Sequence, residues 1–162
     1  MLQSSRTNLR RRKNIPERLW KRILASVPIP CVDVVIYKKV KHETWVLLGY
    51  RKIYPYLHRW ALPGGRIIKG ESLRHTANRQ LQEIGLRPTG DYSLVGVYPV
   101  NFERRSDITV CLSIRLPTEQ ESRPTGELTR HTWRRLNDLP PRLGSNYKAM
   151  LLDFKRGHYL VR

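Results

Sequence analysis

Apolar positions repeat along the chain with two different periods, one typical of strands and the other typical of helices. Runs rich in β-branched and aromatic residues predict strands, whereas apolar residues spaced three and four apart predict amphipathic helices. Strands are expected at residues 31–39, 44–52, 91–99, 107–116 and 129–135, and helices at 16–25, 72–84 and 145–156. Strands interleaved with helices over 162 residues predict a single domain with an α/β or α+β sandwich fold.

The connections between these elements carry their own signals. The segment KVKHE has the length of a hairpin connection between the first two strands. An aromatic-rich loop at 53–63 leads into Pro63-Gly64-Gly65, which is a strong turn signal. The segment ESRPTGE at 121–127 is polar and is expected to be a flexible loop.

The helix expected at 72–84 has two distinct faces. Leu73, Ala77, Leu81 and Ile84 form an apolar stripe that would face a core, and Gly85 ends the helix. A second face, at intervals of four, carries His75, Arg79 and Glu83.

Glu71 precedes this helix, where free N–H groups and the helix dipole favour a carboxylate. It is also within reach of Arg74 or His75 one turn on. On the helix alone, the simplest interpretation is an amphipathic surface helix with an acidic cap. The preceding double glycine changes this, because glycines let backbone carbonyls turn outward without Cβ clashes. Such a carbonyl and one helix carboxylate could share a Mg²⁺ ion whose other ligands are water and phosphate oxygens.

The formal charge of +18, from 31 basic and 13 acidic residues, indicates attraction to polyanions such as nucleic acid, nucleotides or anionic membranes. A solvated basic surface without a specific partner is the alternative. Residues 1–14 form a basic, flexible arm in this interpretation, and residues 15–162 form the domain. No apolar run approaches the roughly 20 residues of a membrane span, and no apolar signal segment follows the basic N-terminus. We therefore expect a cytoplasmic protein whose two cysteines, Cys31 and Cys111, are buried thiols.

The stretch GGRIIKGESLRHTANRQLQEIGL resembles the Nudix box. Gly65, Glu71 and Arg79 match its spacing, Gln80 stands where the pattern has Glu, and the segment is then one residue short. Glu83 can be aligned with either the first or the second glutamate of the Glu-Glu pair in the pattern. Under both alignments, Glu83 is the only acid left on this helix to bind a metal ion. The box of GDP-mannose mannosyl hydrolases is similarly depleted of glutamates, and the resemblance to that branch extends over residues 20–156. It implies a Nudix-type α/β/α sandwich, with a mixed β-sheet between helices.

The same resemblance implies roles for residues outside the box. Asp33 in IPCVDVVIY matches a sugar-contacting aspartate, while Arg51 in LLGYRK and Arg66 in LPGGR match arginines that support the leaving diphosphate. Counting back from Trp133 places Glu127 at a metal-binding Gln and Leu128 at a catalytic His.

Because Leu128 stands at the position of the catalytic histidine, the identity of the general base stays open. Glu127 and His131 are the candidates to assist water, and His131 is alternatively an ordinary, partly exposed strand histidine. Tyr54 and Trp60 in the aromatic loop are candidates to stack on a nucleobase, or they pack the end of the sheet.

The resemblance implies hydrolysis of a nucleoside diphosphate derivative of GDP-mannose type, releasing sugar and nucleoside diphosphate. Mg²⁺, or alternatively Mn²⁺, would be held by a carbonyl of Gly64 or Gly65 together with Glu83 and Glu127. Two alternatives stay open: a conventional Nudix pyrophosphatase that attacks phosphorus, and a catalytically weak module that binds RNA or nucleotides. RNA or another polyanion would bind through the basic arm, and a homodimer is expected.

Overall fold

The computed structural model describes residues 15–117, 120–124, 127–157 and 160–161. It contains the helices α2 (Glu17–Ser26), α3 (Leu73–Glu83) and α4 (Ser145–Arg156). Its strands are β1 (Ile29–Val40), β2 (Glu43–Arg51), β3 (Trp60–Ala61), β4 (Gly64–Arg66), β5 (Ser93–Phe102), β6 (Arg105–Arg115), β7 (Leu128–Arg135) and β8 (Leu160–Val161). The expected arm at residues 1–14 lies outside the described residues.

The strands form one mixed sheet of eight strands in the order β3-β2-β1-β6-β5-β8, with β4 paired to β1 and β7 paired to β2. The central pair, β1 and β6, is parallel, whereas β1–β2, β2–β7 and β5–β6 are antiparallel. A parallel pair needs a long crossover connection, and here α3 and β5 lie on the chain between the two central strands.

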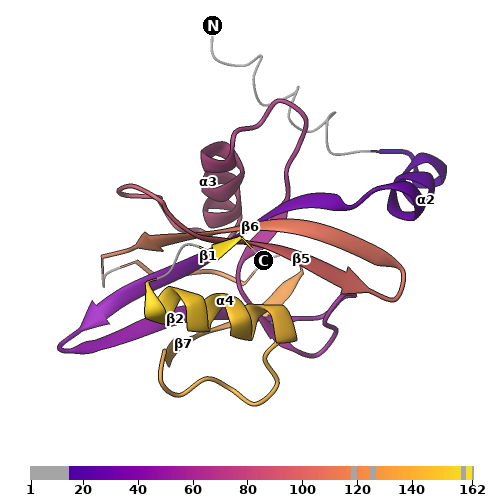
Figure 1. Cartoon of the computed structure of the whole chain (residues 1–162). Helices are drawn as coiled ribbons and strands as arrows, with labels where there is room; N and C mark the ends of the chain where they lie inside the picture. Colours follow the sequence, from indigo (N-terminus) through magenta and orange to yellow (C-terminus); the bar gives the residue numbers. More distant parts are fainter. Residues whose placement is uncertain (1–14, 118–119, 125–126, 158–159, 162) are drawn as a thin grey trace, which may run out of the picture.

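Helices cover both faces of the sheet, with α3 on one side and α4 on the other (Figure 1). The α3 side buries Val32, Val34 and Ile36 of β1 against Ala77 and Leu81. The α4 side buries Val35 against a second cluster that includes Met150 and Leu151. Strand β1 is therefore apolar on both faces, as a central strand between two layers must be. The α/β/α sandwich is confirmed.

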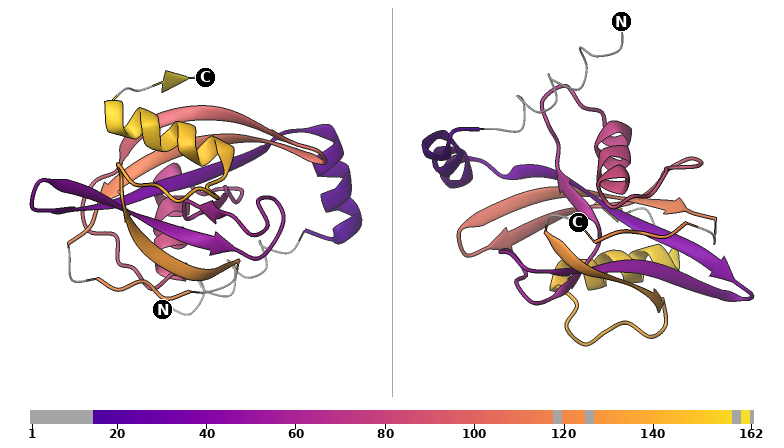
Figure 2. Two further views of the ribbon diagram at one scale, coloured as in Figure 1. Left: turned by 90° about the horizontal axis from the view of Figure 1, so that it is seen from below. Right: turned by 180° about the vertical axis from the view of Figure 1, so that it is seen from behind.

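Strand β1 changes partner along its length, and this change positions the site. Its second half, Tyr37 to Val40, pairs with β2, whereas Cys31 to Asp33 pair with the short strand β4. The end of β2 therefore separates from the start of β1, as the two views in Figure 2 show. A pocket lined by Asp33, Arg51 and Gly64, among other residues, lies at that point.

Three local expectations were wrong. Gly64 and Gly65, expected in a turn, lie in the short strand β4, because β1 offers them an unpaired edge. Leu73, placed on the apolar stripe, is 40% exposed, because it is the first residue of α3 and lies at the outer end of that helix. The short strands β3 and β8 were not expected, since two residues are too few to give a period.

The other expected elements are confirmed, with shifts of a few residues at their ends. Cys31 and Cys111 are buried free thiols, as expected. Across the described segments, no helix is long and apolar enough to cross a membrane.

Candidate active site

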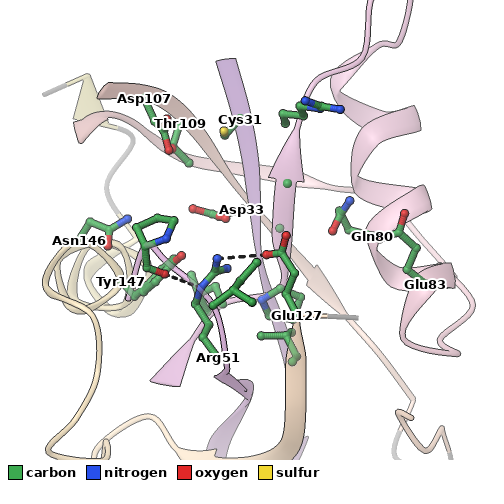
Figure 3. Close-up of a pocket in the computed structure, with 18 of the residues that line it drawn as sticks. Cys31, Asp33, Arg51, Gln80, Glu83, Asp107, Thr109, Glu127, Asn146 and Tyr147 are labelled. Atoms are coloured by element: carbon green, nitrogen blue, oxygen red, sulfur yellow. Dashed lines mark hydrogen bonds and ion pairs between the residues drawn. The ribbon is translucent and has the colours of Figure 1, made fainter. Parts of the chain in front are cut away.

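A cleft of about 700 Å³ opens where β2 separates from β1. Side chains from β1, β2, β4, β6, α3 and α4 line it (Figure 3). It contains most of the residues that the sequence singled out. Those residues are Asp33, Arg51, Tyr54, Gly64, Gly65, Arg66, Glu83 and Glu127.

Asp33 lies at the centre of the cleft. Its side chain is 7% exposed, and no hydrogen bond to its carboxyl is found within the described segments. The pKa of Asp33 is raised to about 7, mainly by burial; Arg51 opposes the shift, Asp107 adds to it, and Arg105 opposes it more weakly. A buried, unpaired carboxyl that titrates near neutrality is able to accept or donate a proton at the pH of most cells.

The glycines of β4 let the backbone approach Asp33 closely. A Cβ on Gly64 would lie 1.9 Å from Asp33 Oδ1, and one on Gly65 would collide with the side-chain amide of Gln80. No residue with a side chain fits at Gly64 without moving the carboxyl. The double glycine thus serves the site by close packing, in a strand and not in a turn.

Arg51 and Glu127 pair across the mouth of the cleft. Arg51 Nη2 lies 3.1 Å from Glu127 Oε2, and Arg51 Nε donates to the Pro55 carbonyl at 2.7 Å. The Arg51 side chain is 11% exposed and that of Glu127 is 56% exposed. Two contacts fix the arginine in place, whereas the glutamate is in contact with water.

On the α3 side of the cleft, Arg79 contacts both Glu71 and Glu83. It donates to both oxygens of Glu71, at 2.9 and 2.8 Å, and its Nη1 lies 3.5 Å from Glu83 Oε1. Glu71 also accepts from the Ile68 N–H and the Thr76 hydroxyl. The hydrogen bonds from Arg79 lower the pKa of Glu71 to about 2. Glu71 therefore ties the loop to the helix. It binds Arg79 and not Arg74 or His75, which are also within reach in the sequence, and Ser72 is the helix cap.

Gln80 occupies the position where the Nudix box has Glu. Its amide fits with the nitrogen donating to the Gly64 carbonyl at 2.7 Å and the oxygen accepting from Arg79 Nη1 at 2.6 Å. A carboxylate could not donate to that carbonyl. The substitution therefore replaces a negative charge by a hydrogen bond that holds β4 against α3.

The oxygen donors that line the cleft are of the kind that a magnesium ion accepts. Glu83 and Glu127 line the same cleft and bring hard oxygen ligands, which Mg²⁺ prefers. The Gly64 carbonyl accepts one hydrogen bond, and a carbonyl oxygen has two lone pairs. In the part of the chain that the structure describes, no cluster of three or more His, Cys, Asp or Glu could hold a metal. Water and phosphate oxygens would have to fill the remaining positions.

Two of the expected site residues do not line this cleft. His131 is partly buried on β7 beside Gly49, neither ring nitrogen has a partner in the described segments, and burial lowers its pKa. Trp60 packs edge-on against Tyr50 with ring centroids 5.1 Å apart. Tyr54 does line the cleft and is 53% exposed, so of the two aromatic candidates only Tyr54 is placed to stack on a ligand.

Arg66 lines the cleft and lies over the Trp20 ring, with 4.9 Å between the guanidinium carbon and the ring centroid. Leu128, which replaces the expected histidine, also lines the cleft and is 8% exposed. It packs over Gly49, where a Cβ would lie 2.5 Å from its side chain. An apolar contact therefore stands where the resemblance places a base.

Sequence reasoning missed a second set of cleft residues on β6 and α4, namely Arg105, Asp107, Thr109, Asn146 and Tyr147. One signal for two of them was present. Asp107 and Thr109 are polar residues two apart beside the apolar residues Ile108, Val110, Cys111 and Leu112 of β6, so they share one face. Asn146 near a helix start carries no such signal.

Comparison with known proteins gives the family. The NUDIX domain model matches residues 27–154. A low-salt glycan biosynthesis protein of Haloferax volcanii, Agl8, is 41% identical over 69 residues, which is 43% of this chain and 42% of Agl8. The chain thus matches less than half the length of this relative.

Two solved structures show the same fold. The NUDIX domain of Shewanella oneidensis NrtR, complexed with ADP ribose, superposes with a TM-score of 0.70 at 23% identity, covering 88% of this chain and 99% of that one. A UDP-X diphosphatase superposes with a TM-score of 0.63 at 18% identity, covering 91% and 76%. With the family model spanning most of the sequence, the chain belongs to the NUDIX family.

Proposed function

We propose that this protein hydrolyses a nucleoside diphosphate sugar of the GDP-mannose type, releasing the sugar and the nucleoside diphosphate. One observation carries the proposal: the buried Asp33, whose carboxyl has no hydrogen bond in the described residues, lies between Arg51 on one side and Asp107 and Thr109 on the other (Figure 3). The name of the partial relative Agl8, a glycan biosynthesis protein, supports a sugar-containing substrate.

The arginines in the cleft suit the diphosphate. Arg51 is held by the Pro55 carbonyl and Glu127, and Arg66 lies against Trp20. Prearranged guanidinium groups stabilise charge that develops on a leaving diphosphate, because they need no reorganisation during the reaction. The sugar would then extend past Asp33, whose ionised form would orient a hydroxyl or the attacking water.

A bound Mg²⁺ would neutralise charge on the leaving diphosphate. Glu83 and Glu127 are the residues that would hold it, with the Gly64 carbonyl as a third donor. Arg79 orients Glu83 from 3.5 Å, so Glu71, which holds Arg79, acts on the site indirectly.

Attack on phosphorus is the competing chemistry. Leu128 offers no base, and the fold is shared with a UDP-X diphosphatase. In that case Glu127 would activate water next to the phosphate, and the products would be two phosphate compounds. The basic arm expected to bind RNA lies outside the described residues, so that role stays a prediction, as does the homodimer.

A substrate panel tests the proposal. We expect Mg²⁺-dependent release of free sugar from GDP-mannose or a related nucleoside diphosphate sugar, and slower turnover of dinucleotides such as Ap4A. Release of nucleoside monophosphate and sugar phosphate would mean a pyrophosphatase. Absence of any turnover with Mg²⁺ or Mn²⁺, together with tight RNA binding, would mean a binding module.

A further inference from the structure

The inner end of the cleft is built by the register of the parallel pair β1–β6. Cys31 is paired with Thr109 and Asp33 with Cys111, and side chains alternate along each strand. Cys31, Asp33, Thr109 and Asp107 therefore face the same side of the sheet, toward α4. Asp107 is 7% exposed and Thr109 is 2% exposed, and both line the cleft.

Helix α4 completes this end with an unsatisfied group. Asn146 lines the cleft, and its Oδ1 is buried without a hydrogen-bond partner in the described part of the chain. A buried amide oxygen without a partner costs free energy in the absence of a ligand. Asp33, whose carboxyl has no hydrogen bond in the described residues, lines the same cleft.

The charges at this end favour an uncharged ligand. Arg105 Nε donates to Asp107 Oδ1 at 2.5 Å, so the arginine is already engaged. Burial raises the pKa of the Cys31 thiol to about 12, which keeps it neutral. Two carboxyls and an amide oxygen would repel a phosphate, but they accept readily from hydroxyl donors.

We propose that Asp107, Thr109 and Asn146 form a subsite, the inner subsite, that binds the hydroxyl groups of the sugar beyond Asp33. This inference rests on the proposed function and adds to it the residues that select the sugar. In Figure 3, Asp107 and Thr109 lie above Asp33 and Asn146 lies to its left, whereas the Arg51–Glu127 pair lies below it. A diphosphate at Arg51 and a sugar at the inner subsite would place the bond between them near Asp33.

The test compares two ligands that differ only in the sugar. GDP-mannose and the methyl ester of GDP, in which a methyl group replaces the sugar, are titrated into the full chain with Mg²⁺ on ice, to limit turnover. Asn146→Ala and Thr109→Val remove the proposed contacts, and Asn137→Ala is the matched control in an exposed turn outside the cleft. Each lost hydrogen bond should weaken GDP-mannose binding by about three- to tenfold, leave the methyl ester unchanged, and leave Tm unchanged or raised for Asn146→Ala.

The outcomes separate this inference from the proposed function. If the unmodified protein prefers and hydrolyses GDP-mannose but both variants keep that preference, the inner subsite is wrong and the function stands. Equal weakening of both ligands would mean that the residues only support the fold, which also overturns the inference. If the unmodified protein binds the two ligands equally and releases no sugar, both proposals fall.

Discussion

Arg51 and Glu127 hold each other at 3.1 Å across the mouth of the cleft, joining the end of β2 to the start of β7. In the absence of substrate, each neutralises the other. On the proposed function, an incoming diphosphate would compete with Glu127 for the guanidinium and would be repelled by the carboxylate. A divalent cation would reverse that repulsion, because Glu127 and the phosphate could then share it.

Glu127→Gln should therefore have opposite effects on binding and turnover. Without divalent metal, GDP should bind several-fold more tightly, since a competing anion has been removed from Arg51. With Mg²⁺, turnover should fall by about 10- to 100-fold, the usual loss when groups around a metal are altered. Calorimetry in EDTA and steady-state kinetics in Mg²⁺ measure the two effects. Unchanged GDP affinity in EDTA would show that the ion pair does not compete with the ligand.

Glu83→Gln should lower activity by about 10- to 100-fold and raise the Mg²⁺ concentration needed for half-maximal rate. Glu83 is 41% exposed and lies at the end of α3, so Tm should change little. Glu43→Gln is the matched control, because Glu43 pairs with Arg135 outside the cleft. Mn²⁺ binding followed by electron paramagnetic resonance gives a readout that does not depend on turnover. Parental activity at saturating Mg²⁺ would remove Glu83 from the metal site.

Asp33→Asn should stabilise the fold while impairing the reaction. The pKa of Asp33 in the folded protein, about 7, lies above its ordinary value of 3.8. The stability of the fold therefore falls as pH rises from about 4 to 7, because ionising the buried carboxyl costs free energy. The variant escapes this cost and should gain on the order of a few kcal/mol at pH 8. In the parent, kcat/KM should rise with pH to a plateau above about 7, as Asp33 ionises. Urea unfolding at pH 5 and pH 8 checks the first part, and a flat parental pH profile through 7 would contradict the second.

Glu71→Gln should remove a source of acid sensitivity. The pKa of Glu71 in the folded protein, about 2, lies below its ordinary value of 4.5. Its stabilisation of the fold is therefore complete above about pH 4.5 and is lost as pH falls toward 2. The shift corresponds to about 3 kcal/mol for this largely buried pair. The variant should be less stable than the parent at pH 7, and the difference should shrink by pH 3. If the free energies of unfolding of variant and parent differ equally at pH 7 and at pH 3, the ion pair with Arg79 does not set the pKa of Glu71.

The fold was largely predictable, because strong periods mark the long elements. The β-branched run in β1 and the four-residue spacing in α3 gave their type and approximate bounds. What could not be predicted was the change of partner along β1. That change depends on whether Gly64 and Gly65 turn or pair, and both conformations suit glycine.

The site was predictable only where a motif gives spacing. Glu83 and Arg51 were found from motifs, and both line the cleft. Asp107 and Asn146 were missed, because the parallel register of β1 with β6 and the docking of α4 bring them together across the chain. His131 was predicted to assist water but does not line the cleft. The strand period predicts which face of the sheet a residue lies on, but not how far along the strand the cleft extends.

Hydrolysis of GDP-mannose with Mg²⁺ in ¹⁸O-labelled water tests the proposed function most directly. If water attacks the sugar carbon, the free mannose gains ¹⁸O and the GDP stays unlabelled. Mass spectrometry of both products distinguishes the outcomes in one reaction, and the Glu83→Gln variant provides the enzyme-dependent blank. We expect label in the sugar. Label in a phosphate product would contradict the proposal and would mean a pyrophosphatase that attacks phosphorus.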